Sequence, residues 1–469
     1  MSLSQQEQDA QDLKKLGYAQ ELFRDMGGFS NFAISFSIIS ILTGATQLYG
    51  YGLQHGGPFQ ITVGWIIVSI FTMTVALSMA ELASAYPTAG ALYHWASFLG
   101  GRTLGWFTAM FNTIGQFAIL AGIDYGLTLF LISILEITPT PIQTMGIYAS
   151  LLLSHSILNH IGIHVVAMLN NFSAWYHIAV VFLLLGALAY AGFNQPIEFL
   201  TTFHNTDGYD PKYSFLVGLL LAQWTLTGYD ASAHVSEETV NPRKTAPWGI
   251  FLAVVISVVF GFLMLAAVTL TITDLSAAAA LGDGAFVPLL KARLGEMGTA
   301  ITWLIAGAMW LCGLSAMTSA SRMVYAFARD GGLPFSHIWA KIEPKHRTPA
   351  NAIWGLCALA LLLGLSVEAY SAVVSIAVIA LYISYGLPIA ARLYSRFIVK
   401  KDEVGPWNLG SFSTPVALVA IVWIAFISVI FVLPPNDKAG LYIGGCVALL
   451  LVIWFLIARR KFKGPRYHV

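Results

Sequence analysis

The sequence has few charged residues and few cysteines. Only 10% of its 469 residues are Asp, Glu, Lys or Arg, whereas soluble domains carry about 25%. This composition excludes an ordinary soluble protein. The three cysteines (Cys312, Cys357 and Cys446) all lie in apolar runs, so neither a disulfide framework nor a zinc pattern is expected. The formal net charge is +1 and no basic stripe occurs outside the loops, so no nucleic-acid partner is expected.

Motifs of catalysis and ATP hydrolysis are also missing. The chain has no His-Glu-x-x-His metal pair and no Gly-x-Ser-x-Gly elbow, so we expect no enzyme, metal or cofactor. It has no phosphate-binding loop that would indicate drive by ATP. Rings of charge or a filter sequence would indicate a channel, and neither is found. The polar N-terminus lacks the apolar core of a cleaved signal peptide.

Long apolar segments dominate the chain. The hydrophobic fraction is 57%, and a membrane-spanning helix needs about 20 mostly apolar residues. We therefore predict an all-α polytopic protein in a lipid bilayer. The twelve predicted spans are residues 29–53, 61–83, 104–134, 142–160, 163–192, 213–234, 247–272, 299–327, 349–367, 370–394, 412–433 and 440–458.

The basic residues orient these spans. With the N-terminus inside, only four of the 24 Lys and Arg residues fall on the outer side, and basic residues are known to concentrate on the cytoplasmic side. Both termini are therefore predicted to be cytoplasmic, and the short termini favour a bacterial inner membrane. The outer four are Lys212, Lys291, Arg293 and Lys438.

Polar and glycine residues interrupt two of the spans at membrane depth. Gly44, Gly50 and Gly52 interrupt the first, and Thr227-Gly228 interrupts the sixth. Broken backbone at that depth is tolerated only where protein or a watery cavity surrounds it. Two such segments at corresponding places in two halves point to the substrate site of a transporter.

Three motifs resemble the amino acid–polyamine–organocation permease superfamily. They are AELASAYPTAGALYHW (80–95), TGYDASAHVSEETVNPRKTAPWGI (227–250) and SRMVYAFARDGGLP (321–334). The opening GGFSNFAISFSIISILTGATQLYGYGL is most similar to the branch that carries γ-aminobutyrate, choline and other amino acids. The resemblance covers nearly the whole chain.

The resemblance implies a fold of the leucine-transporter type, with two inverted repeats of five helices, broken helices 1 and 6, and two added helices. The segments would be a cytoplasmic N-terminus, the first repeat, the second repeat, helices 11 and 12, and a cytoplasmic tail. Their boundaries are 1–28, 29–192, 213–394, 412–458 and 459–469.

At the first break, Thr43, Gly44 and Ala45 are candidates for binding a substrate carboxylate, because a half-helix presents free N–H groups and a positive dipole end. The resemblance places Leu42-Thr43-Gly44 on the family's Gly-Ser-Gly turn, although only one glycine is present. The alternative is that these small residues only let helices pack closely.

At the second break, Asp230 is a candidate for the substrate site or a gate, since an ionised carboxylate in a membrane needs a partner, a proton or a cation. Alternatively, Asp230 caps freed N–H groups of the backbone. Thr227 and Gly228 belong to the same break, and Trp224 and Tyr229 resemble the family's aromatic gate or are ordinary packing.

Asp124 in the third span, with Gln116 on nearly the same face, is a further candidate for binding a substrate amine. The alternative is that Asp124 lies near enough to the outer surface to meet water. A quaternary ammonium ringed by aromatic side chains would also suit such a cavity.

His177 in the fifth span matches the place of a Lys in proton-coupled relatives, where it would face helices 1 and 8. A histidine changes charge near neutral pH, so it suits proton coupling; a neutral core histidine is the alternative. Thr318 and Ser319 are candidates for the opposing wall. Gating or structural roles at the inner mouth are expected for Glu81, Glu237, Arg243 and Arg329.

The sequence thus predicts a secondary active transporter that moves a small amino acid or ω-amino acid, such as γ-aminobutyrate, by proton-coupled alternating access. A choline or polyamine transporter and an amino-acid exchanger of the same fold are the alternatives. The sequence gives no indication of the oligomeric state.

Overall fold

The computed structural model describes residues 4–364, 370–400 and 402–465. Within them, every regular secondary-structure element is a helix. The β-structure consists of two isolated bridges, Met26 with Thr239 and Glu343 with Thr348. The expected all-α class is confirmed. Residues 365–367 of the predicted ninth span lie outside the described residues.

The first part of the chain forms eight α-helices joined by short turns. Some of them follow one another almost without a break, as at the π-helical turn η1 (Gln60–Gly64) before α5. The helices are α1 (Gln5–Lys15), α2 (Gly28–Ile39), α3 (Ile41–Gln47), α4 (Tyr49–Phe59), α5 (Trp65–Ala85), α6 (Leu92–Leu135), α7 (Pro141–Ile161) and α8 (Ile163–Ala191).

The second part begins with three short helices in place of one long span. They are α9 (Pro211–Gly218), α10 (Leu220–Thr225) and α11 (Ala231–His234). The remaining helices are α12 (Pro242–Thr269), α13 (Leu275–Ala280), α14 (Phe286–Leu294), α15 (Glu296–Arg329), α16 (Ser336–Trp339), α17 (Ala350–Gly364), α18 (Tyr370–Tyr394), α19 (Ser413–Ile430), α20 (Asp437–Ile453) and α21 (Arg459–Lys461).

Nine helices of the described residues are long and apolar enough to cross a membrane. The other three predicted spans correspond to α7, to the broken series α9–α11, and to α17, whose described part has 15 residues. The described helices therefore establish a polytopic membrane protein. The count of twelve and the inverted repeat stay predictions.

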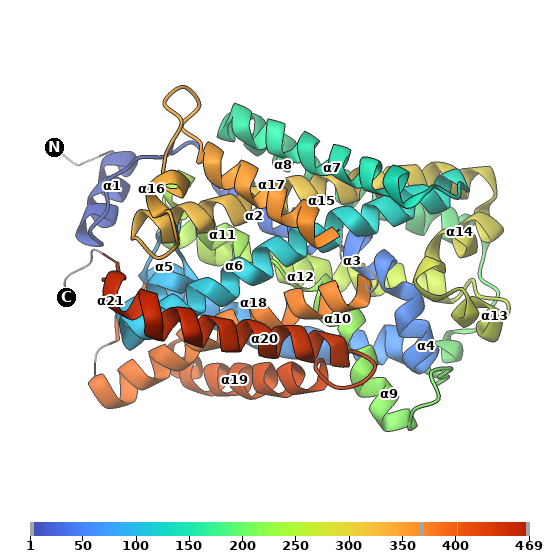
Figure 1. The fold of residues 1–469 in the computed structure, drawn as a ribbon. Coiled ribbons are helices and arrows are strands. Elements are labelled where there is room, and N and C mark those ends of the chain that lie inside the picture. Colours follow the sequence, from blue (N-terminus) through green and yellow to red (C-terminus); the bar gives the residue numbers. More distant parts are fainter. Residues whose placement is uncertain (1–3, 365–369, 401, 466–469) are drawn as a thin grey trace.

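The long helices run side by side, and both termini lie at the same end of the bundle (Figure 1). The short helices α13 and α14 lie at the opposite end, beyond α4. Helix α6 packs along α18, and α2 lies among α8, α12 and α15. Helices α19 and α20 cover one side of this core, where both contact α18.

Helix α4 packs tightly at the end that carries α13 and α14. A Cβ atom added at Gly50 would lie 1.6 Å from the carbonyl oxygen of Gly282, so only glycine fits without a backbone shift. In contrast, a Cβ at Gly146 in α7 would have no atom within 4 Å.

We predict that Gly50→Ala lowers the midpoint of thermal unfolding in detergent, because overpacking typically costs about 1–3 kcal/mol. The matched control, Gly146→Ala, adds the same methyl group in open space and should not lower it. Equal midpoints for Gly50→Ala and the unmodified protein would contradict the close contact.

Candidate functional site

The first break lies between α2 and α3, at Ser40, whose φ of 26° and ψ of 84° leave the helical region. The Ser40 hydroxyl lies 2.8 Å from Nε2 of His177 and 2.6 Å from the hydroxyl of Thr43. A positive φ at a residue other than glycine is strained and persists only where the surroundings impose it. These two contacts hold the side chain of Ser40 at the break.

The break falls earlier than the sequence predicted. Thr43, Gly44 and Ala45 lie in α3, and the N–H groups of Thr43 and Gly44 donate to the Ser40 carbonyl (2.7 and 3.0 Å). A Cβ at Gly44 would lie 2.7 Å from Cα of Thr225 in α10. Close helix packing, the alternative explanation for this glycine, is therefore what its contacts show.

The second break spans residues 226–230, between α10 and α11. Gly228 has a φ of +100°, and a Cβ there would lie 2.2 Å from Cγ2 of Ile38 in α2. Glycine is thus required both by the backbone conformation and by the approach of α2. The hydroxyl of Tyr382 donates to the Leu226 carbonyl (3.1 Å), which satisfies an acceptor at the end of α10.

Side chains of α2 join the two broken helices. The Ser35 hydroxyl donates to the Tyr229 carbonyl (2.8 Å) and accepts from the Ser232 N–H (2.9 Å). Asn31 donates through Nδ2 to the Ser232 carbonyl (2.9 Å). These hydrogen bonds satisfy backbone N–H and C=O groups that lack helical partners at the second break.

Asp230 lies at the centre of this region and is fully buried. Its Oδ1 accepts from the Tyr385 hydroxyl (2.9 Å), and its Oδ2 accepts from Gln116 Nε2 (3.0 Å) and Asn112 Nδ2 (3.4 Å). Nε2 of His234 lies 3.2 Å from the same Oδ2. The structure thus brings together Gln116 and Asp230, two of the predicted substrate residues.

Asp230 does not act as a helix cap. It stands directly before α11, yet its side chain accepts no N–H from that helix. Among the described residues, no Lys or Arg forms an ion pair with this carboxylate, and His234 is its one ionisable basic neighbour. The other ring nitrogen of His234, Nδ1, lies 3.0 Å from the Ala89 carbonyl, so both nitrogens face acceptors and only a ring with two N–H groups can donate to both. A positive group that arrived beside Asp230 would therefore share or take over the place of the His234 imidazole.

Aromatic side chains stand around the second break. The rings of Tyr229 and Tyr385 lie 5.4 Å apart, beside the Asp230 carboxylate that Tyr385 contacts. Trp224 is buried, and its indole Nε1 has no hydrogen-bond partner in the described chain. The Thr227 hydroxyl donates back to the Gln223 carbonyl (2.5 Å), so in this conformation its donor is occupied.

His177 in α8 meets the first break directly. Its Nδ1 lies 2.8 Å from the Ser173 carbonyl, an acceptor, so the neutral ring carries its proton on Nδ1. Nε2 is then free to accept from the Ser40 hydroxyl.

The two residues predicted for the opposing wall do not contact His177 through a described hydrogen bond. Thr318 donates to Oδ1 of Asn159 (2.7 Å), and the buried Ser319 hydroxyl has no partner among the described residues.

Asp124 does not contact the carboxylate of Asp230. Its Oδ2 lies 3.1 Å from Nδ1 of His155 in α7, and both side chains are fully buried. Asp124 and Gln116 share α6, but their described contacts are different. Full burial also overturns the alternative that Asp124 reaches water near the outer surface.

Glu237 and Arg329 form a bidentate ion pair at the end of the bundle that holds the termini (2.8 and 2.9 Å). Glu237 also accepts the N–H of Ala89 (3.1 Å). Burial by itself would favour the neutral carboxyl, but the charge and hydrogen bonds of Arg329 outweigh it, and the pKa of Glu237 lies below its usual 4.5.

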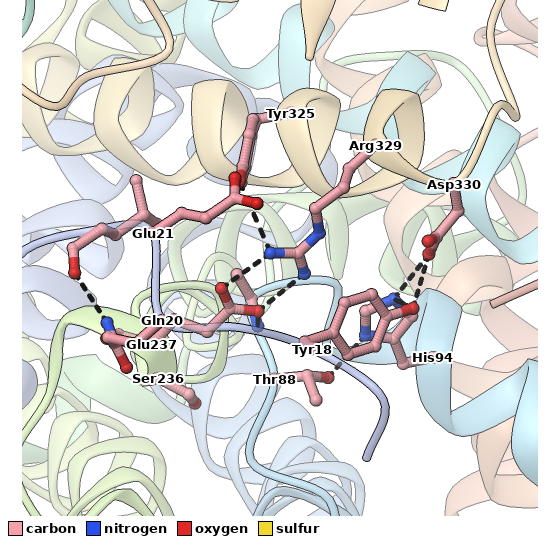
Figure 2. Close-up of polar contacts among 12 residues, drawn as sticks. Tyr18, Gln20, Glu21, Thr88, His94, Ser236, Glu237, Tyr325, Arg329 and Asp330 are labelled. Atoms are coloured by element: carbon pink, nitrogen blue, oxygen red, sulfur yellow. Dashed lines mark hydrogen bonds and ion pairs between the residues drawn. The ribbon is translucent and has the colours of Figure 1, made fainter. Parts of the chain in front are cut away.

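The N-terminal segment completes this group. Figure 2 shows the ring of Tyr18 between Arg329 and His94, with the Arg329 Cζ atom 4.2 Å from the ring centroid. The Tyr18 hydroxyl donates to Oδ2 of Asp330 (2.7 Å) and lies 2.9 Å from Nε2 of His94. We call Tyr18, His94, Glu237, Arg329 and Asp330 the inner cluster.

The other two predicted gating residues lie outside the inner cluster. Glu81 pairs with Arg392 (2.7 Å) and accepts from the Ser413 hydroxyl, which ties α5 to α18 and α19. Arg243 donates to the Ser84 carbonyl (3.2 Å) and lies 4.0 Å from Asp12.

Several residues of the site were not predicted from the sequence. His234 follows Asp230 by four positions in the same motif, so helical spacing could have indicated it. Asn112 precedes Gln116 by four and carries the same kind of signal. Ser40 and Tyr385 gave no local signal, because only the fold brings them to the breaks.

No group of three or more His, Cys, Asp or Glu side chains in the described residues could hold a metal ion.

We predict that Glu237→Gln lowers stability by about 3–5 kcal/mol, because it leaves the buried Arg329 without its counter-ion. This stabilisation should be complete above the unfolded-state pKa near 4.5 and decrease as pH falls through the lower folded-state pKa. Thermal unfolding across pH measures both effects. The control, Glu136→Gln, removes an exposed partner of Lys291 and should change little; similar losses in both variants would contradict the buried pair.

Comparison with known proteins agrees with the motifs. A family model described as "Amino acid permease" matches residues 26–457. The rice (Oryza sativa subsp. japonica) protein "Amino-acid permease BAT1 homolog" is 39% identical, with 97% of this chain and 94% of that protein covered. "Amino-acid permease BAT1" of Arabidopsis thaliana is 37% identical (97% and 95% covered). "Amino-acid permease 2" of Neurospora crassa is 30% identical (100% and 91% covered).

These relatives are plant and fungal proteins, so they give no support to the predicted bacterial inner membrane. Their names describe permeases, which are transporters and not enzymes. Together with the apolar helices, they show that this chain is an integral multi-pass membrane protein and belongs to the amino acid permease family of the amino acid–polyamine–organocation superfamily.

Proposed function

We propose that this protein is a secondary active transporter that carries a small amino acid or ω-amino acid, such as γ-aminobutyrate, by proton-coupled alternating access. The relatives named as amino-acid permeases support the substrate class. The observation that carries the proposal is Asp230, a buried carboxylate that contacts neutral donors and the His234 imidazole, and no described Lys or Arg, beside two helix breaks.

The substrate amine would bind near Asp230. Tyr385, Gln116 and Asn112 hold the carboxylate in position, and the ammonium group of a substrate would compete with the His234 imidazole for it. The rings of Tyr229 and Trp224 would enclose the ligand. We do not include Asp124 in this site, because its described partner is His155.

The substrate carboxylate would bind at the first turn of α3. The first N–H groups of a helix have no acceptor within that helix, and its N-terminus carries positive partial charge. Thr43, Gly44 and Ala45 lie in this turn or next to it. The N–H groups of Thr43 and Gly44 donate to the Ser40 carbonyl in this conformation, so a bound carboxylate would have to displace that carbonyl. Thr225 occupies the space beside Gly44, so we place the carboxylate at the N-terminal end of α3, beside Ser40.

Alternating access is supported by the difference between the two ends of the bundle. At the end with the termini, the inner cluster is buried and closed by hydrogen bonds. At the other end, a cavity of about 80 Å³ is lined by residues that include Thr46, Gln47, Phe286 and Tyr370. A larger cavity of about 500 Å³ lies at the end with the termini, and its lining, which includes Gly332, Leu333 and Phe462, contains no member of the inner cluster. This arrangement suits a conformation closed to the cytoplasm, if the termini are cytoplasmic as the distribution of basic residues predicts.

Proton coupling would act through His177. In the neutral ring, Nε2 accepts the Ser40 hydroxyl; a proton on Nε2 makes it a donor, and that hydroxyl must turn toward another acceptor. The hydroxyl of Thr43 is already 2.6 Å away. Protonation would thus reorder the hydrogen bonds that fix the first break, next to the proposed carboxylate site.

An organocation such as choline or a polyamine is the second candidate. The buried Asp230 and its aromatic neighbours Tyr229, Tyr385 and Trp224 would suit a positive group that has no carboxylate. Exchange of one amino acid for another on the same site is the third candidate.

We predict that amino acids or ω-amino acids raise the thermal unfolding midpoint in a ligand screen that also contains choline and putrescine. A ligand at 100 times its Kd stabilises a protein by about 2.7 kcal/mol. Asp230→Asn should weaken binding at least about tenfold, because a charged hydrogen bond contributes about 1.5–3 kcal/mol. Asp437→Asn, at an exposed position, is the matched control. Stabilisation only by cations without a carboxylate would refute the amino-acid substrate.

We predict that a pH gradient drives uptake into proteoliposomes and that sodium is dispensable. His177→Ala should abolish the response to the gradient and leave some exchange, because the reordering of Ser40 is lost. The control His337→Ala removes an exposed imidazole from α16. If the pH dependence of uptake were unchanged in His177→Ala, the proposed role of His177 in proton coupling would be wrong.

A further inference from the structure

Asp124 and His155 form a second buried titratable pair, separate from the proposed substrate site. Asp124 lies on α6 and His155 on α7, with Oδ2 and Nδ1 3.1 Å apart. Both side chains are 0% exposed. Neither the substrate contacts of Asp230 nor the His177 contacts at the first break involve them.

Each member of the pair keeps one polar atom without a partner. Oδ1 of Asp124 and Nε2 of His155 are buried, and neither has a hydrogen bond in the described chain. Both oxygens of Asp230, in contrast, accept hydrogen bonds. Buried unpaired polar atoms are costly, and each calls for an explanation. Here the two atoms provide sites on which a proton can reside.

Among the described residues, no Lys or Arg forms an ion pair with either side chain. Titratable groups in electrostatic contact with Asp124 include Tyr148 of α7, Cys312 of α15 and Cys357 of α17, and none of these three is basic. The ring of Trp310 packs 5.2 Å from the His155 ring and helps to exclude water.

The pair has room for one additional proton, because Asp124 Oδ1 and His155 Nε2 are unpaired in the described chain. In contrast, the oxygens of Asp230 and both nitrogens of His234 have partners. An ionised Asp124 beside a neutral His155 leaves a net charge of −1 in a low-dielectric interior, which is unfavourable. One added proton makes the pair neutral, whether the proton resides on the carboxylate or on the imidazole. A second would leave a net charge of +1. The pair can therefore hold or release one proton.

Helix α15 connects this pair to the first break. A Cβ at Gly313 would lie 2.3 Å from Oδ1 of Asp124, so the α15 backbone rests directly against the pair. The preceding residue, Cys312, donates through Sγ to the Ile38 carbonyl (3.3 Å), two positions before Ser40. A change in the charge of the pair would thus act on α15 beside the end of α2.

We propose that Asp124 and His155 form a proton-binding site, distinct from His177, whose occupancy acts on the first break through α15. The effect on transport rests on the proposed function, whereas proton binding does not. The geometry of the pair, its two unpaired atoms and its lack of a described Lys or Arg partner carry the inference.

Infrared difference spectroscopy across pH tests this site in the purified protein, because a protonated carboxyl absorbs apart from the amide bands. The full-length protein should show a titrating carboxyl band that is lost in Asp124→Asn and kept in His177→Ala. In His155→Gln the proton affinity behind the band should change at least about tenfold, or one pH unit. This variant keeps the test valid if Asp124→Asn fails to fold.

Three outcomes would overturn the inference. The carboxyl band could persist in Asp124→Asn, or its pH midpoint could be unchanged in His155→Gln. Alternatively, sodium added at constant pH could remove the band, and this result would indicate a metal-cation site. Ligand-induced thermal stabilisation supplies the distinguishing readout. His155→Gln should retain it, and loss of stabilisation in Asp124→Asn to the extent seen in Asp230→Asn would return Asp124 to the substrate site. If no ligand stabilised even the unmodified protein, the proposed function would fail while the infrared result still decided the proton site.

Discussion

Backbone N–H and C=O groups released at membrane depth must find new partners, and the central region of this protein is arranged around that requirement. At the first break, Ser40 is held through its hydroxyl by His177. At the second, the Ser35 hydroxyl of α2 donates to the Tyr229 carbonyl in the break and accepts the N–H of Ser232 in α11. The Tyr382 hydroxyl of α18 donates to the Leu226 carbonyl. The side chains that satisfy the breaks thus also join helices that are distant in the sequence.

Buried charge is treated differently in different parts of the molecule. In the inner cluster, Glu237 has Arg329 as a full counter-ion. Outside the cluster, the buried Glu238 is paired with Arg322 in the same way. Asp230, between the breaks, has neutral donors and one imidazole instead. A saturated ion pair suits a closure that forms and opens as a unit, whereas an anion without a fixed cation suits a site that receives a positive ligand.

Hydropathy and glycine placement were sufficient to predict an all-α membrane protein with broken first and sixth helices, and the resemblance of three motifs indicated its family. The spacing from Gln116 to Asp124 did not reveal that their contacts diverge, because His155 comes from another helix. The break was expected at Thr43–Ala45 but falls at Ser40, because side-chain contacts with His177, and not glycine content, fix its position. The contacts of Tyr18 with His94 and Asp330 were not predicted, because a polar N-terminal segment gives no signal of where it binds the helices.

We propose that the two breaks together bind one small charged solute, with its positive group at Asp230. An electron cryomicroscopy structure of the protein with γ-aminobutyrate or another stabilising amino acid tests it most directly. We expect the ligand amine within hydrogen-bonding distance of the Asp230 carboxylate and the ligand carboxylate at the start of α3, beside Ser40. A ligand bound elsewhere, with the present contacts of Asp230 all intact, would contradict it.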